Sequence, residues 1–403
     1  MKRRRVKITG IGPVTPAGIG KAAFWKGILE PISRIVPYRE LGTDFGSFVA
    51  ARVDDFRISD YLNEPFVLPK GSSRQALFAV AGAILALRDA ELSFEELSET
   101  SSAVVTGSSL MDFGSIGVSI DAVQKRGARG AHARALYSMG ISSVPSAVNL
   151  ALGITAPTMG ISTQCSAGLD AIGHAANLVA NGQAEIAICG GSEAPLYKFP
   201  MLELRAADLT PATDEMPARL SRPFDLWRTT GVVSEGAAMF VIEPESSRRR
   251  GYSWISGYAC GNDTPGDLCG GLIYAAKQAM AEARIRTTQI EAISAWGPGH
   301  KHVDKGEADA MKRLFGSQFD GIPTVSIKGA IGTSLGSAPA VQVAAAALAL
   351  AEKILPPTVN WDYPDPACAF NLSNRSRDIF HSNVLVNTHG AGGVNACMVL
   401  ERC

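Results

Sequence analysis

Two segments of this 403-residue chain share one plan: a short β-type run, an abrupt turn, and then small apolar residues at helical spacing. The turns are 161–166 and the Gly-rich run 329–336. The apolar positions are Leu169, Ile172, Ala176 and Val179 after the first turn, and Val341, Ala344, Ala345 and Leu348 after the second. Helices of this kind are buried ones. The pattern therefore predicts an internal duplication with one buried helix in each half.

Short β-branched runs alternate with amphipathic segments along the whole chain, which is typical of an α/β protein. Several runs are continuously apolar, as expected of strands covered on both faces. The predicted strands are 5–10, 102–107, 155–163, 185–190 and 237–242, followed by 254–258, 292–295, 324–327, 384–387 and 396–400. The polar, turn-rich run 243–251 is the predicted seam, so we expect one half at 1–250 and the other at 251–403.

Two segments of the first half show no clean strand pattern. Residues 110–150 and 196–232 are rich in Arg, Pro, Met and Asp. Insertions of this size usually carry binding surface or subunit contacts. We therefore predict that both form lids or interface rather than core.

The composition excludes several classes of protein. The 38 basic and 38 acidic residues balance, so nothing favours nucleic acid or an anionic membrane as a partner. Seven scattered cysteines form no C-x-x-C pair, which argues against a zinc site and against disulfides, and favours a reducing cytoplasm. The longest apolar stretch, 338–355, is interrupted by Pro339, Gln342 and Glu352. We predict a buried helix there, no membrane span and no bound metal.

Cys165 lies where a β-type run gives way to a helical one, within 161–170. A thiol at such a turn projects from the backbone at the positive end of the new helix, which lowers its pKa and makes it nucleophilic. A buried structural thiol, the commonest state of a free cysteine, is the alternative. The turn favours the nucleophile. A hydrolase-type turn is disfavoured because it needs a small residue where Thr163 stands.

The Cys165 turn strongly resembles the nucleophile turn of the β-ketoacyl-acyl carrier protein synthases, the elongating condensing enzymes of fatty acid and polyketide assembly. Five further segments carry the resemblance, in the family's order and spacing: 4–12 with 15–18, 24–27, 190–193, 222–225 and 234–237. The resemblance implies a thiolase-like α/β fold with two pseudo-symmetric halves in a five-layered α-β-α-β-α core. It also implies a dimer, of like or unlike chains, formed through the strand 155–163.

By the same resemblance, Cys165 takes an acyl chain from the phosphopantetheine arm of an acyl carrier protein, and the chain needs no cofactor of its own. The backbone N–H groups of Cys165 and Ala391 would form the oxyanion hole. Ala391 and Gly390 belong to the Gly-rich loop 389–395, which suits the close approach of N–H groups to a substrate oxygen. The family has a bulky phenylalanine gate where Ala391 stands, so we expect a more open entrance.

Two positions depart from the family where it keeps the histidines that promote decarboxylation. The family's Asn-Ala-His-Gly-Thr motif reads Ser-Ala-Trp-Gly-Pro at 294–298. Its Thr-Gly-His-Leu-Leu-Gly motif reads Ile-Gly-Thr-Ser-Leu-Gly at 331–336. Trp296 and Thr333 therefore replace both histidines. Neither an indole nor a hydroxyl shuttles protons near neutral pH as an imidazole does.

Lys328 matches the family's lysine and either lines the pocket or pairs with a carboxylate such as Glu307. The match favours the role in the site. We expect Asp304 and Glu307 to form a structural network that holds the loop of Trp296.

Three histidines lie near these motifs. His300 and His302 offer a replacement for the lost base, but side chains on such a loop more often face solvent, and that is our expectation. His389 stands beside the oxyanion loop, where the family has an apolar residue. A pocket-lining role and a structural role are equally open for it.

The sequence leaves three functions to compare. The first is an acyltransferase that loads an acyl chain onto Cys165 for elongation or transfer. The second is a non-catalytic partner like the chain-length-factor subunit of heterodimeric ketosynthases, which fits the loss of both histidines but not the presence of Cys165. The third is a complete condensing enzyme that uses His300, His302 or His389.

Overall fold

The computed structural model describes residues 3–42, 44–62, 68, 71–380 and 382–403. Its main sheet has the strand order β11-β10-β14-β15-β9-β1-β8-β7-β5-β6. The strands are β1 (Val6–Thr15), β5 (Ser102–Gly107), β6 (Thr158–Ile161), β7 (Ile186–Glu193), β8 (Gly236–Pro244), β9 (Ser253–Asn262), β10 (Ala292–Ser294), β11 (Thr324–Val325), β14 (Asn383–Gly390) and β15 (Val394–Arg402). All ten predicted strands are confirmed, nine of them with shifted ends and β5 with the ends predicted.

The two halves repeat one topology strand for strand. The first half runs β1-β8-β7-β5-β6 and the second runs β9-β15-β14-β10-β11. In each half the first two neighbour pairs are antiparallel and the last two are parallel. The halves join where β1 pairs with β9 at Val6, Lys7 and Ile8. The predicted internal duplication is confirmed, and the turn-rich run 243–251 lies almost entirely between the two halves' strands.

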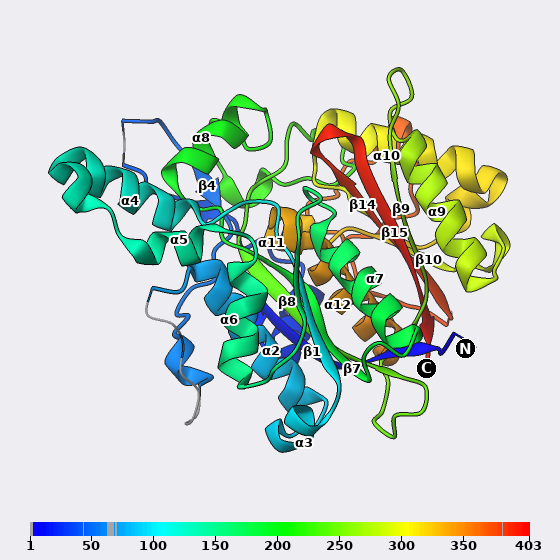
Figure 1. Ribbon diagram of the computed structural model, residues 1–403. Coiled ribbons are helices and arrows are strands. Elements are labelled where there is room, and N and C mark those ends of the chain that lie inside the picture. The colour runs from blue at the N-terminus through cyan, green and yellow to red at the C-terminus, as the bar shows by residue number, and fades with distance from the viewer. Residues whose placement is uncertain (1–2, 43, 63–67, 69–70, 381) are drawn as a thin grey trace.

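Helices complete five layers around these strands (Figure 1). The middle layer is α7 (Ala167–Ala180) and α12 (Ala338–Glu352), which share the largest apolar core with strands of both halves. Helices α2 (Arg74–Asp89) and α6 (Ser143–Leu152) cover the outer face of the first half, and α9 (Gly270–Ala283) and α10 (Lys301–Phe315) cover that of the second. The predicted thiolase-like architecture and its two buried helices are confirmed.

The run Leu335–Glu352 is long and apolar enough to cross a membrane, but 89% of it is buried inside the protein. It contains α12, which packs between the two halves. This helix is apolar all round because protein surrounds it, as predicted.

The two central helices touch through glycine. A Cβ placed on Gly168, in the first turn of α7, would lie 2.7 Å from the carbonyl oxygen of Gly336 and 3.2 Å from the Cβ of Ala340. A side chain does not fit there. Glycine therefore lets the backbones at the starts of α7 and α12 meet directly.

The two inserts are partly core, so the prediction that both lie outside it was wrong. Helix α6 buries five apolar residues against α2 and β5: Val144, Ala147, Val148, Ala151 and Leu152. Phe224, from the second insert, is fully buried against the outer helices of the second half. In contrast, α4 (Phe113–Arg126) and α5 (Ala133–Met139) leave apolar side chains exposed, including Val118, Leu136 and Tyr137.

The remaining helices and strands are short. They are α1 (Lys21–Leu29), α3 (Phe94–Glu99), α8 (Lys198–Ala206), α11 (Lys328–Ile331), β2 (Gly18–Ile19), β3 (Val36–Pro37), β4 (Val49–Ala50), β12 (Ile354–Leu355) and β13 (Arg377–Asp378). Strand β6 ends the main sheet, and three of its four residues are exposed.

Candidate active site

Cys165 lies on a tight turn between β6 and α7, two residues before the helix begins. Gln164 takes the left-handed conformation, with φ at 52°, which turns the chain sharply into the helix. The carbonyl of Cys165 accepts a hydrogen bond from Thr388 Oγ1 on β14 at 3.2 Å. The nucleophile turn of the first half is thus fixed to a strand of the second half.

The Cys165 side chain lines a cavity of about 240 Å³. The same cavity is lined by Trp296, Thr333, His389, Gly390 and Ala391, all predicted as site residues, and by His300. These residues come from both halves of the chain. Lys328 is the predicted site residue that the cavity lining does not include.

Two backbone N–H groups face the thiol. The N–H groups of Ala391 and of Cys165 itself both lower the pKa of the Cys165 thiol. A Cβ on Gly390 would lie 3.2 Å from the backbone nitrogen of Cys165, so glycine lets this loop approach the nucleophile closely. These are the two donors predicted for an oxyanion hole, and this arrangement can stabilise negative charge beside sulfur.

The predicted low pKa of Cys165 was wrong. Burial raises the pKa of the thiol to about 11, and the negative charge of Glu193 acts in the same direction. The two N–H groups and the positive charge of Lys328 oppose this rise without cancelling it. At neutral pH the thiol therefore keeps its proton, although its side chain is partly exposed to the cavity.

A network of two buried carboxylates holds the loop of Trp296. Glu307 accepts hydrogen bonds from the backbone N–H groups of Trp296 and Gly297, at 2.8 and 2.9 Å. Asp304 accepts from those of Gly299 and Phe224, at 3.1 and 2.7 Å. Burial raises the pKa of Asp304 to about 7 and also raises that of Glu307. The predicted structural network is confirmed.

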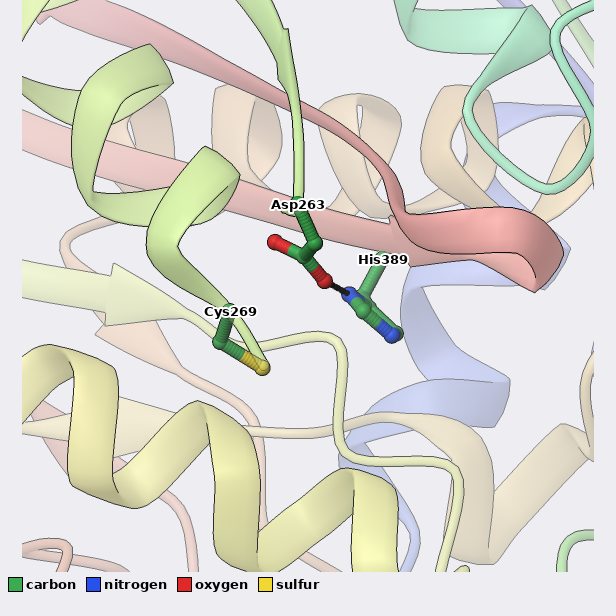
Figure 2. A group of neighbouring side chains, drawn as sticks. All are labelled: Asp263, Cys269 and His389. Carbon is green, nitrogen blue, oxygen red and sulfur yellow. Dashed lines mark ion pairs between the residues drawn. The ribbon is translucent and has the colours of Figure 1, made fainter. Parts of the chain in front are cut away.

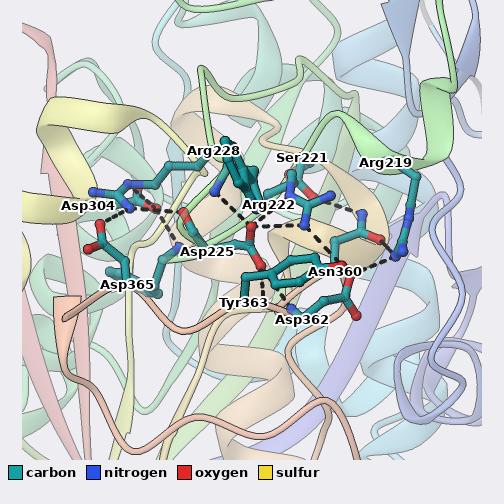
Figure 3. A network of polar contacts seen from close by, with 12 residues as sticks. Arg219, Ser221, Arg222, Asp225, Arg228, Asp304, Asn360, Asp362, Tyr363 and Asp365 are labelled. Carbon is teal, nitrogen blue, oxygen red and sulfur yellow. Dashed lines mark hydrogen bonds and ion pairs between the residues drawn. The ribbon is translucent and has the colours of Figure 1, made fainter. Parts of the chain in front are cut away.

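Asp304 also belongs to a larger network of arginines and carboxylates (Figure 3). Arg228 Nη1 lies 2.5 Å from Asp365 Oδ2, and its Nε lies 3.9 Å from Asp304 Oδ2. Asp225, fully buried, accepts from the backbone N–H groups of Asp362 and Tyr363 at 2.8 and 2.7 Å. The motif at 222–225 therefore binds residues 362–363 through Asp225 and binds Asp304, which holds the Trp296 loop, through the N–H of Phe224.

Lys328 is buried behind Trp296. Its Nζ lies 4.3 Å from the centroid of the indole ring and donates a hydrogen bond to Gln342 Oε1. Burial lowers the pKa of Lys328 to about 7, against the negative charges of Glu307 and Asp304. The side chain is 1% exposed. The indole therefore stands between the family's lysine and the cavity, which corrects the predicted pocket-lining role.

Thr333 is the residue that the sequence motif predicts in place of the family's second histidine. Its backbone is fixed by the carbonyl of Val232 and the N–H of Ser234, at 2.8 and 3.0 Å. Its hydroxyl is buried and has no hydrogen-bond partner among the described residues. Thr333 therefore supplies the cavity with no group that exchanges protons.

His300 faces the cavity, which corrects the prediction that it faces solvent. Its Nδ1 accepts the backbone N–H groups of His302 and Val303, at 3.2 and 3.3 Å, and so caps the start of α10. Burial lowers the pKa of His300. His302 is exposed, as expected. The sequence signal for this cap was a polar residue directly before the helical run 301–315.

His389 lines the cavity and is also held by a hydrogen bond to Asn395 and an ion pair with Asp263, the latter drawn in Figure 2. Its Nδ1 lies 2.7 Å from Asn395 Oδ1 and 3.9 Å from Asp263 Oδ2. Both roles left open by the sequence are therefore real. The sequence reasoning missed Asn395 and Asp263. Asn395 had a signal, since the hairpin of β14 and β15 pairs it directly with His389.

Cys269 lies close to the same group, within 4.8 Å of the Asp263 and His389 ligand atoms. These residue types bind metals elsewhere. Here, however, the Asn395 amide donates to Asp263 Oδ1 and to the Gly393 carbonyl, at 2.9 and 2.8 Å, so its oxygen must accept from His389. Nδ1 of His389 then carries a hydrogen and is no metal ligand.

Profiles of the beta-ketoacyl synthases match most of the chain. The N-terminal domain profile covers residues 3–248 and the C-terminal domain profile covers residues 252–362. The putative polyketide beta-ketoacyl synthase 1 of Streptomyces virginiae is 34% identical, over 99% of this chain and 98% of that protein. The 3-oxoacyl-[acyl-carrier-protein] synthase 2 of Vibrio harveyi is 30% identical, over 100% and 99%.

Solved structures agree with these matches. The ishigamide ketosynthase/chain length factor superposes with a TM-score of 0.92 at 25% identity, over 100% of both chains. A type II polyketide synthase acyl-carrier protein in complex with its ketosynthase bound to the hexaketide gives 0.90 at 26%, also over 100% of both chains. The fold, the placement of Cys165 and these comparisons lead to one conclusion: the chain belongs to the beta-ketoacyl synthase family.

Proposed function

We propose that the protein is an acyltransferase that accepts an acyl chain on Cys165 from an acyl carrier protein thioester. One observation carries this proposal: the backbone N–H groups of Cys165 and Ala391 both lie close enough to the thiol to lower its pKa, and Gly390 packs against the backbone nitrogen of Cys165. Two such donors stabilise the oxyanion that forms when sulfur attacks a thioester carbonyl. Collapse of that intermediate releases the carrier thiol and leaves the chain on Cys165.

We place decarboxylation outside this site. Trp296 and Thr333 hold the positions of the family's two histidines, and Trp296 also covers the positive charge of Lys328. At these two positions a malonyl thioester would meet the indole of Trp296 and the side chain of Thr333 instead of imidazoles. The acyl group on Cys165 is then elongated or transferred in fatty acid or polyketide assembly by a partner that supplies the missing chemistry.

The partners follow from the relatives. One similar structure contains an acyl-carrier protein with its ketosynthase, and another is a ketosynthase/chain length factor. We propose an acyl carrier protein as the substrate-bearing partner, with no cofactor beyond its phosphopantetheine arm. We further propose a dimer of like or unlike ketosynthase-fold chains, paired through the exposed edge of β6, in the cytoplasm.

A chain-length-factor-like subunit is the second candidate. The exchange of both histidines supports it, because such a subunit shapes a cavity without performing the reaction. The two N–H groups near the Cys165 thiol argue against it, since a subunit without chemistry has no need of such donors.

Intact-protein mass spectrometry after incubation with acyl carrier thioesters of several chain lengths tests the proposal. We expect one acyl adduct on the wild type and none on Cys165→Ala. Cys260→Ala is the matched control, because it removes an exposed thiol that does not line the cavity. If no adduct depends on Cys165, alone or with a co-expressed partner subunit, the subunit function replaces the enzyme. Carbon dioxide release from malonyl carrier protein would instead support a complete condensing enzyme.

A further inference from the structure

The cavity contains two imidazoles, although neither stands at a family histidine position. His300 and His389 both line it, together with Cys165. Their hydrogen bonds fix the two rings in opposite tautomers, so the rings offer different atoms to a substrate. This difference decides which of them can take a proton.

His300 offers a donor. Its Nδ1 accepts two backbone N–H groups at the start of α10, so the ring hydrogen of the neutral form lies on Nε2. Protonating Nδ1 would break the helix cap. His300 therefore cannot accept the proton of a thiol without loss of local structure.

His389 offers an acceptor. Because Asn395 donates its amide hydrogens to Asp263 and Gly393, its oxygen accepts the hydrogen on Nδ1 of His389. The lone pair of the neutral ring is then on Nε2, on the side of the ring away from Asp263 (Figure 2). This Nε2 makes no hydrogen bond to any described residue, and its ring lines the cavity.

Asp263 is placed to stabilise the protonated ring. Its Oδ2 lies 3.9 Å from His389 Nδ1 and is buried without a hydrogen-bond partner among the described residues. A buried carboxylate oxygen without a partner is costly, and a positive charge on the facing ring offsets that cost. Cys269 is the other titratable group close to the ring on this side, and Cys165 and His300 line the same cavity.

The segment that carries His389 touches the nucleophile on both sides. Thr388 donates to the Cys165 carbonyl at 3.2 Å, Gly390 lies against its backbone nitrogen, and the N–H of Ala391 faces its sulfur. The imidazole is therefore held on the short run of β14 that forms the oxyanion loop.

We infer that His389 is the proton acceptor for the Cys165 thiol, with Asn395 and Asp263 as its positioning residues. In this step the S–H bond breaks, the proton moves to Nε2, and the electron pair remains on sulfur. When sulfur attacks the carrier thioester, the carbon–sulfur bond to the carrier breaks, and the imidazolium returns the proton to the departing carrier thiolate. The acyl step rests on the proposed function; the proton acceptance does not.

The test is the rate of alkylation of Cys165 by iodoacetamide as a function of pH, followed at the peptide that contains Cys165. We expect the wild-type rate to show a step in the range in which imidazoles titrate, about pH 5 to 8. His389→Gln should lose this step and react about 10²-fold more slowly at neutral pH, at the lower end of general-base effects. The alkylation rate of this variant should rise only toward a pH of about 11, where the thiol itself ionises. His302→Gln, which changes an exposed histidine near the cavity, should match the wild type.

Asp263→Asn gives a second measurement that does not require His389→Gln to fold. Loss of the carboxylate that faces Nδ1 should move the step to lower pH. A step that persists in folded His389→Gln, or that stays in place in Asp263→Asn, overturns the inference. Because iodoacetamide replaces the carrier thioester, this result is independent of the proposed function. If an acyl adduct forms but the alkylation rate has no pH step that depends on His389, the proposed function stands and the role of His389 as proton acceptor is rejected. If the pH step is present but no acyl adduct forms, the role of His389 stands and the proposed function is rejected.

Discussion

The turn before α7 and the turn before α12 occupy equivalent places in the two halves, yet only the first presents a reactive side chain to the cavity. Cys165 stands on the first turn, with two N–H groups facing its sulfur. We call this side of the cavity, formed by Cys165 and residues 390–391, the first wall. Thr333 stands on the second turn with a buried hydroxyl that has no partner among the described residues. Trp296, from the neighbouring loop, completes this second wall.

The two walls differ in which atoms perform chemistry. On the first wall the donors are backbone N–H groups, and glycine at 390 lets them approach. On the second wall the resemblance places the family's two imidazole side chains, and we predict from the sequence motifs that Trp296 and Thr333 replace them. Main-chain chemistry survives such exchanges because every residue except proline has an N–H. Side-chain chemistry does not survive them.

The largest effect we predict concerns the support of the second wall. Glu307→Ala should lower the free energy of unfolding by about 3–5 kcal/mol, because it leaves buried N–H groups of Trp296 and Gly297 unpaired and the charge of Lys328 uncompensated. Urea unfolding measures this. Asp309→Ala, on the same helix but half-exposed and paired with Lys305, should change little. Equal effects of both variants would contradict a supporting role for Glu307.

A pH-dependent effect should come from Glu193, which joins the second wall to residues 109–110 by accepting backbone N–H groups of Gly336, Ser109 and Leu110. Burial raises the pKa of Glu193 from 4.5 to about 7. Between these values the folded protein binds more protons than the unfolded chain, so the free energy of unfolding falls as pH rises through this window.

The expected fall is of the order of 3 kcal/mol, and Glu193→Gln should remove it. Urea unfolding of both proteins between about pH 4.5 and 8 gives the comparison. Because burial also raises the pKa of Asp304 to about 7, the free energy of unfolding of the variant should still fall somewhat as pH rises. A variant with the same pH slope as the wild type would show that Glu193 is not the titrating group.

Restoring imidazoles to the second wall should restore part of its chemistry. Trp296→His combined with Thr333→His should raise carbon dioxide release from malonyl carrier protein by about 10²-fold, the lower end of acid–base effects. Trp227→His, which changes an exposed tryptophan, is the control. No release from the double variant would mean that the wall differs from the family in more than these two side chains.

The smallest effect we predict lies beside the first wall, at the edge strand that leads to Cys165. Met159 is 47% exposed on β6. Met159→Lys should weaken the proposed dimer at least about tenfold, because like charges then meet at the paired edge. Light scattering during gel filtration reads this out. Tyr274→Lys on α9, far from β6 in the fold, should leave the assembly intact, and equal dissociation in both would rule out pairing through β6.

Most of the architecture could be predicted from the sequence, because strands that are covered on both faces have continuous apolar runs. The sequence was also sufficient for α6, although we missed it: Val144, Ala147, Val148 and Ala151 follow helical spacing on one face. The polar residues between them hid the pattern. Phe224 carries no such signal, since its burial depends on segments distant in the chain.

The site was harder to predict because its chemistry depends on depth and on long-range contacts. Helix position alone suggested a low pKa for Cys165, but burial dominates, and only the folded chain reveals burial. Lys328 matched its motif, yet the indole of Trp296, 32 positions earlier in the chain, separates it from the cavity. The tautomer of His389 depends on Asp263, which approaches from the end of β9.

The glycine contact at the starts of α7 and α12 limits which changes of sequence can alter this site. Since the backbones meet at Gly168 and Gly336, the spacing between the nucleophile turn and the opposite turn is fixed by main-chain atoms. A change in the chemistry of the cavity must then come from substitutions of individual side chains rather than from a shift of the two turns. The predicted replacement of two histidines by Trp296 and Thr333 is a change of this kind, because it alters side chains and leaves the glycine contact in place.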